Sequence, residues 1–170
     1  MSTYYRKIMV TLDGSAFASQ ALLHAEQLAT ALGAELILFQ VVPDTDGFLP
    51  NPSGYPAMLR KELADEATTL RHESGQAMNP LDIVERALEN LADGLRRHDL
   101  EVRCVVDTGS PAKKIINYLQ HNDVDLLVMS THGRSGVARA LFGSVAQEVS
   151  HKVACPILLV KAKSGSEEPS

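Results

Sequence analysis

The chain has 170 residues, of which 45% are hydrophobic and 22% are charged, as is typical of one globular domain and not of a disordered segment. It carries 21 acidic residues against 16 lysines and arginines, a formal net charge of −5. This balance argues against a nucleic-acid binder with a broad basic face. The N-terminal residues show no signal-peptide core, and no stretch reaches the ~18 apolar residues of a membrane helix. We therefore predict a cytoplasmic protein without membrane insertion.

The chain alternates short apolar runs, typical of buried strands, with helical patterns. Gly33 is expected to end the first helix as a C-cap, and Ser110-Pro111 to start another as N-cap and first helical residue. In chain order the pattern predicts strand 8–12, helix 16–32, strand 35–42, helices 57–73 and 81–97, strand 100–106, helix 111–120, strand 125–129, a helix from 144 and strand 156–160.

The linking segments differ in composition from these elements. Prolines and glycines predict a loop over 44–56, within a loop and extra helical insert spanning 43–80. Residues 163–170 are polar and Ser-rich and are expected to form a flexible tail. Residues 1–162 are thus interpreted as one domain.

Continuous apolar strands that alternate with helices indicate a parallel sheet covered on both faces. The prediction is an open doubly wound α/β fold with five parallel strands. In such a fold the ligand lies at the carboxyl ends of the strands, where the strand order reverses. The loops after the first, second and fourth strands are therefore the candidate positions for a site.

The two cysteines, Cys104 and Cys155, lie in apolar surroundings and are too few for a disulfide framework. We expect two buried, reduced core thiols.

The segment 129–145, MSTHGRSGVARALFGSV, is the most informative part of the chain. It follows a strand and ends at a helix start, where Ser144 is the expected N-cap and Gln147 has capping-box spacing. Free amides and the positive end of the helix dipole bind phosphate, and Arg134 and Arg139 could add charge. Taken alone, its glycines could equally form a simple turn. No P-loop motif and no G-x-G-x-x-G after the first strand is present.

Three blocks of sequence resemble the universal stress protein family: KIMVTLDGS (7–15), ELILFQVV (35–42) and the stretch 109–161. The ATP-binding branch of that family carries Gly, two residues, Gly, nine residues, Gly, then Ser or Thr. The matching positions here are Ser130, Gly133, Gly143 and Ser144. Serine in the first position is a departure from the motif. A positive φ there would cost a non-glycine residue about 1–2 kcal/mol, whereas a need only for a small side chain would accommodate serine.

The resemblance implies a set of nucleotide-binding residues. Asp13 would accept from a ribose hydroxyl or the adenine edge, although it could instead serve as a turn or cap residue. His132 could touch a phosphate or be an ordinary loop residue, and Val41 alone would be interpreted as core. The implied residues are Thr11, Leu12, Asp13, Val41, Met129, Ser130, His132, Gly133, Arg134, Gly143, Ser144 and Val145.

Three functions follow as hypotheses. The first is an ATP-binding regulator of an unidentified protein partner, with Mg²⁺ on the phosphates and slow or no hydrolysis. The resemblance implies a homodimer, possibly a tetramer, through the last strand from Pro156 to Lys161, an edge that would otherwise expose an apolar ladder. The second is a dimeric interaction module that has lost nucleotide binding. The third is an enzyme, either a hydrolase or an adenylate-forming transferase. The absence of a G-x-S-x-G elbow argues against an α/β-hydrolase, and the absence of H-x-G-H argues against adenylyl transfer. Without an evident general base or catalytic lysine beside the loop, we expect at most a weak ATPase.

Overall fold

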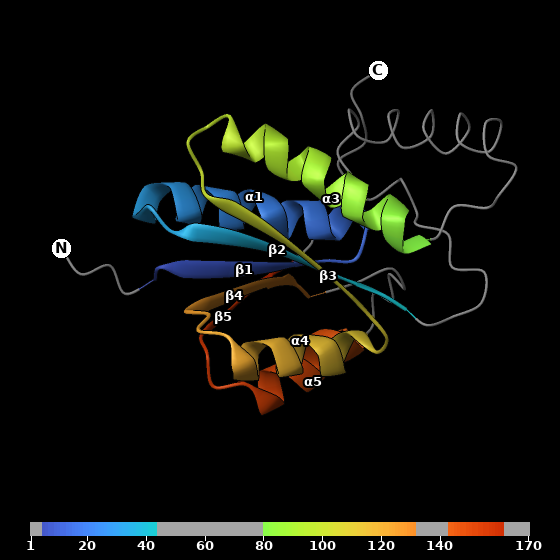
Figure 1. The fold of residues 1–170 in the computed structure, drawn as a ribbon. Helices are drawn as coiled ribbons and strands as arrows, with labels where there is room; N and C mark the ends of the chain where they lie inside the picture. The colour runs from blue at the N-terminus through green and yellow to red at the C-terminus, as the bar shows by residue number, and fades with distance from the viewer. Residues whose placement is uncertain (1–4, 44–79, 132–142, 162–170) are drawn as a thin grey trace, which may run out of the picture.

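The computed structural model describes residues 5–43, 80–131 and 143–161 (Figure 1). The predicted loop 44–56, helix 57–73 and tail 163–170 lie outside these ranges. The elements are β1 (Lys7–Leu12), α1 (Ala16–Leu32), β2 (Glu35–Val42), α3 (Pro80–Arg96), β3 (Val102–Thr108), α4 (Pro111–His121), β4 (Leu126–Ser130), α5 (Ser144–Lys152) and β5 (Ile157–Val160).

The five strands form one parallel sheet in the order β3-β2-β1-β4-β5. Helices α1 and α3 cover one face of the sheet, and α4 and α5 cover the other (Figure 1). This arrangement confirms the predicted open doubly wound fold. The strand order reverses at β1, which pairs with β2 on one side and β4 on the other. The carboxyl ends of β1 and β4 therefore form the switch point of the sheet.

Buried side chains alternate between the two faces along each strand. In β1, Ile8 and Val10 pack toward α1 and α3, whereas Met9 packs toward α4 and α5. All three are fully buried, because helices cover both faces of the sheet and leave no polar side for the strand. This is the physical reason why strands appear in the sequence as continuous apolar runs.

The boundaries of β3 differ from the prediction by two residues at each end. Leu100 is buried in the core before the strand begins. At the other end, Asp107 and Thr108 continue the pairing with Val41 and Val42 of β2. The apolar pattern stops at Val106 because the last residues of this edge strand are polar, although their backbone still pairs.

Asp125 links the two central strands at the amino end of the sheet. Its Oδ2 accepts hydrogen bonds from the amides of Arg6 (2.8 Å) and Lys7 (2.9 Å), and its own amide donates to the Lys7 carbonyl (2.9 Å). A charged acceptor on two amides is a strong contact. It fixes β1 against β4 at the edge opposite the carboxyl ends.

Helix α1 begins and ends with side-chain and backbone caps. Ser15 is the N-cap, and its Oγ accepts from the Ala18 amide (3.2 Å). Gly33 ends the helix in the left-handed conformation at φ +62, as predicted. Helix α4 starts at Pro111 with Ser110 as N-cap, also as predicted, but the Ser110 side chain makes no capping hydrogen bond. Within the described ranges, no helix has the length and apolar character needed to cross a lipid bilayer.

Two glycine substitutions should have opposite effects on stability. A Cβ added at Gly33 or at Gly94 of α3 would have no atom within 4 Å, so packing is not a factor at either position. Gly33→Ala should lower the free energy of unfolding by about 1 kcal/mol because of its left-handed φ. Gly94→Ala should raise it by about 0.5–1 kcal/mol because alanine is the better helix residue. Urea unfolding measures both, and shifts of equal sign would contradict this account.

Candidate functional site

A cavity of about 280 Å³ lies at the carboxyl ends of the central strands. It is bounded by the ends of β1, β2 and β4 and by the first turns of α4 and α5. This is the position where the strand order reverses. The lining residues are Thr11, Leu12, Asp13, Phe39, Val41, Pro43, Pro111, Ile115, Met129, Ser130, Thr131, Gly143, Ser144, Val145 and Ala146.

Every site residue implied by the sequence that falls within the described ranges lines this cavity. The segments 11–13, 129–130 and 143–145 are far apart in the sequence and meet there with Val41. His132, Gly133 and Arg134 lie outside the described residues, as does Arg139. The fold therefore brings the described candidate residues together around one cavity.

The sequence analysis missed the lining residues Phe39, Pro43, Pro111, Ile115, Thr131 and Ala146. Phe39 could have been found by strand alternation, because it lies two residues before Val41 and therefore on the same face. Pro111 and Ile115 are one helical turn apart on α4 and share a face. No local signal shows that this face meets the end of β2, which only the assembled fold reveals.

One end of the cavity is apolar. Phe39, Val41 and Met129 come from the sheet and are nearly fully buried, and Ile115 faces them from α4. The ring of Tyr118 packs behind Phe39 with a centroid separation of 4.9 Å. Such a surface suits a flat, largely apolar group of a ligand.

The first turn of α5 forms a further part of the cavity lining, and here one prediction is wrong. Gly143 and not Ser144 is the N-cap, with φ −67 and ψ 155, and its carbonyl accepts from the Gln147 amide (2.9 Å). The Gly143 amide donates to the carbonyl of Thr131, which fixes the backbone so that helical geometry begins one residue later. A glycine N-cap has no side chain, so no capping box forms.

The first turn of α5 presents backbone amides without an acceptor among the described residues. The first residues of an α helix have no acceptor within the helix. Among the described residues, none accepts a hydrogen bond from the amides of Ser144, Val145 or Ala146. These donors line the cavity at the positive end of the helix dipole. The arrangement can hold an anionic group.

Ser130 has no conformational cost in its position. It is the last residue of β4 and pairs with Val160 of β5. Among the described non-glycine residues, only Asp99 has a positive φ, at 57°. Ser130 therefore does not have the left-handed conformation that favours glycine. The position therefore does not require glycine for its backbone, and the departure from the family motif leaves the fold of this segment intact.

Asp13 has the turn role that the sequence left open. Its Oδ1 accepts from the Ser15 amide (2.9 Å), and Gly14 between them has φ 73. An Asx turn of this kind holds the carboxylate in place at the end of β1. Asp13 also lines the cavity. Among the described lining residues, it is the only one with a charged side chain. No group of three or more potential metal ligands occurs among the described residues.

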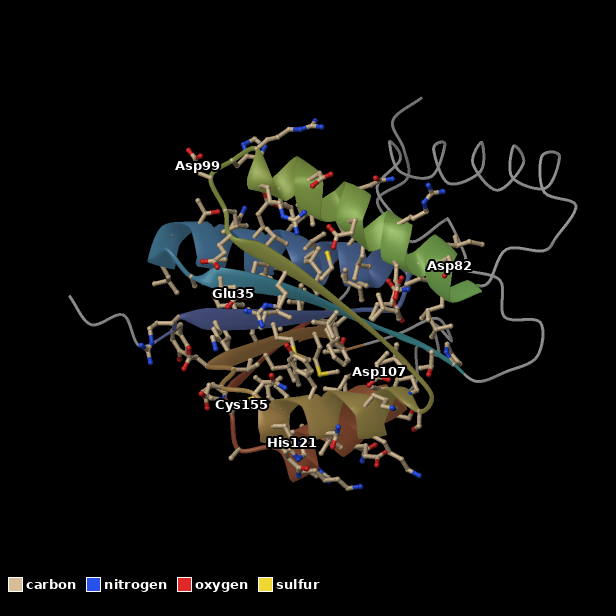
Figure 2. The ribbon with its side chains drawn as sticks, in the orientation of Figure 1. Glu35, Asp82, Asp99, Asp107, His121 and Cys155 are labelled. Carbon is tan, nitrogen blue, oxygen red and sulfur yellow. The ribbon has the colours of Figure 1, made fainter. Side chains whose placement is uncertain are left out.

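Both cysteines lie outside the cavity and are half-buried, in contrast to the full burial expected from the sequence. Burial, followed by the nearby charge of Glu89, raises the pKa of Cys104 to about 12. Its Sγ lies 3.4 Å from the Leu88 carbonyl. Burial also raises the pKa of Cys155, which lies near the start of β5 (Figure 2). The structure has both as free thiols.

Cys104 should alkylate slowly in the folded protein. In a Cys155→Ala variant, iodoacetamide at pH 9 should modify Cys104 at least about 100-fold more slowly in buffer than in urea, since only the thiolate reacts. The raised pKa also means that the unfolded state loses this proton first as the pH rises above 9. The stability contributed by Cys104 is therefore lost between pH 9 and 12. Equal rates in buffer and urea would contradict the raised pKa.

The fold and the cavity define a class: doubly wound α/β proteins with a cavity at the switch point of the sheet. Within that class, the sequence identifies one family. The model of the universal stress protein family matches residues 4–161. The chain belongs to the universal stress protein family.

Individual relatives agree with this assignment. Universal stress protein MJ0531 of Methanocaldococcus jannaschii is 32% identical over 157 residues, covering 92% of this chain and 82% of the relative. The solved structure of protein MJ0577 has a TM-score of 0.67 at 24% identity and covers 95% of this chain and 99% of its own.

Two further solved structures share the fold and hold nucleotides. A universal stress protein in complex with cAMP has a TM-score of 0.58 at 21% identity, with 92% of this chain and 97% of the other covered. A universal stress protein family member from Arabidopsis thaliana with AMP bound has a TM-score of 0.61 at 15% identity, with 93% and 92% covered. At these identities the similarity shows the fold alone.

Proposed function

We propose that this chain binds ATP in the cavity and acts as a nucleotide-dependent regulator of a protein partner. The observation that carries the proposal is that one cavity combines an apolar surface with the first turn of α5, which has no side-chain cap. A nucleotide has the same two parts, a flat base and an anionic phosphate group. The solved structures with cAMP and AMP support a nucleotide as the ligand class.

The lining residues suggest how the nucleotide lies. The base packs against Val41 and Ile115, and the phosphates accept from the amides of Ser144 and Val145. Asp13 lies at the end of β1 and lines the same cavity, and in this proposal its carboxylate accepts from a ribose hydroxyl. Mg²⁺, if bound with the nucleotide, would neutralise charge on the phosphates.

A regulatory role fits the lining better than an enzymatic one. The described lining residues include no lysine, arginine or histidine. Rapid phosphoryl transfer requires several positioned charges around the reacting phosphate. Slow or absent hydrolysis is part of this proposal, and the nucleotide acts by altering the surface that the partner contacts.

The proposal is tested by nucleotide content and affinity. The purified protein is denatured, the released small molecules are identified by mass spectrometry, and the emptied and refolded protein is titrated with ATP, ADP, AMP and cAMP by calorimetry. We expect ATP to be released or to bind saturably. No nucleotide and no heat at millimolar ATP would contradict the proposal and leave a dimeric interaction module of the same fold.

We also propose a homodimer through β5. This strand ends the sheet, and Ile157, Leu158 and Leu159 are only half-buried there. An apolar edge strand needs a partner to satisfy its backbone and cover its side chains, and a second copy of β5 supplies both. Light scattering at micromolar concentration should give twice the monomer mass, or four times if dimers pair. A monomer would contradict this interface.

A further inference from the structure

We propose that the ion pair between Asp107 and Lys114 fixes the width of the apolar end of the cavity and so determines which size of base it accepts. This inference rests on the proposed nucleotide binding. The pair is a positioning device: neither side chain lines the cavity. It acts through Pro111 and Ile115, which do.

The pair joins β3 to α4 beside the cavity wall. Lys114 Nζ lies 2.9 Å from Asp107 Oδ1. Asp107 pairs in register with Val41, a lining residue of β2. Lys114 precedes Ile115 in α4 and follows Pro111 by three residues. Figure 2 shows Asp107 at the end of β3, next to the start of α4. Movement of Lys114 away from Asp107 would therefore move the α4 side of the cavity, with Pro111 and Ile115, away from the β2 side.

The sheet side of this contact is rigid. The Thr108 amide donates to Asp107 Oδ1 (2.7 Å), which holds the carboxylate in one orientation. The Gly109 amide donates to the Val42 carbonyl (2.9 Å), and Gly109 has φ 120, a conformation suited to glycine. The turn between β3 and α4 is thus fixed to β2, and Asp107 presents a fixed anchor to α4.

The helix side has fewer polar contacts that fix its start. Ser110 makes no side-chain capping bond, and Pro111 has no amide to donate. Further along α4, Tyr118 packs on Phe39, which holds the third turn of the helix. The first turn, which carries the lining residue Pro111, packs on the sheet through the buried Ala112, and Lys114 adds the ion pair to Asp107. Side chains of the pair are 38% and 35% exposed, so the pair adds little to global stability and acts mainly on local position.

Lys114→Met removes the pair and keeps the aliphatic stem. We expect the preference for ATP over UTP, measured as the ratio of dissociation constants, to fall about three- to fivefold, the range expected for one partly exposed ion pair. A looser wall loses contact with a purine and tolerates other bases. Lys114→Arg should restore the preference because it keeps the charge. Lys113→Met, the same change at the exposed neighbouring lysine, should leave the preference unchanged.

Hydrogen exchange of the α4 amides in the nucleotide-free protein gives a second readout. Lys114→Met should speed exchange over residues 112–118 relative to Lys113→Met and Lys114→Arg. If the parent protein binds no nucleotide, the proposed function is wrong, and exchange alone decides whether the pair positions α4. If the parent binds ATP but Lys114→Met changes neither ratio nor exchange, the positioning inference is wrong. Faster exchange with an unchanged ratio would overturn the role in base selection.

Discussion

Gly143→Val should weaken ATP binding at least about 100-fold and leave the fold intact. Gly143 lines the cavity next to the first amides of α5, so a branched side chain there occupies the space that the phosphates need. The backbone tolerates the change because φ −67 and ψ 155 are accessible to any residue. The hydrogen bond from its amide to the Thr131 carbonyl does not depend on the side chain.

Calorimetric titration with ATP measures the effect, and the urea midpoint confirms that the variant is folded. Gly143→Ala is the matched control, since one methyl group should give an intermediate loss. ATP affinity equal to that of the parent in the valine variant would show that Gly143 only shapes a turn and that the phosphates do not lie at α5.

Ser144→Pro should weaken ATP binding about 10- to 100-fold, because it removes one amide that can donate to a phosphate. The substitution suits this position unusually well. Ser144 is the first helical residue of α5, where proline is favoured. Gly143 has the extended ψ of 155 that a residue before proline adopts. Among the described residues, no acceptor of the Ser144 amide is lost.

Two comparisons isolate the amide from other effects. Ser144→Ala removes only the hydroxyl and should cost less than the proline variant. Adenosine, which has no phosphate, should bind the parent and Ser144→Pro with the same affinity. An equal loss for adenosine and ATP would mean that the proline disturbs the whole cavity and that the amide account is wrong.

The sequence predicts the fold well because the physical signal is local. Helix α1 and strand β2 have the predicted bounds, since Gly33 and Pro43 end them and their apolar residues follow one period. The end of β3 was placed too early because Asp107 and Thr108 pair through their backbone, and polar side chains on an edge strand give no apolar signal.

The site was predicted in part for a similar reason. The motif positions Ser130, Gly143 and Ser144 meet at the cavity, and their role in nucleotide binding stays a prediction. The N-cap of α5 was misplaced by one residue because its position is set by the hydrogen bond to Thr131, a contact 12 residues away in the sequence. The α4 wall was missed because only the packing of the helix on the sheet brings Ile115 to the end of β2.

The central position of β1 has a consequence for synthesis. On a ribosome β1, β2 and β3 emerge first, and α1 and α3 can cover one of their faces. The outer edge of β1 pairs only with β4, whose Asp125 lies 119 residues after Arg6. Translation adds about 5–20 residues per second. The edge of β1 therefore stays unpaired for on the order of ten seconds, until β4 is synthesised, and the second apolar face of the sheet stays exposed until α4 and α5 follow. We expect the nascent chain to be a target for chaperones over this interval. Phe39 and Val41 on that exposed apolar face later line the finished cavity.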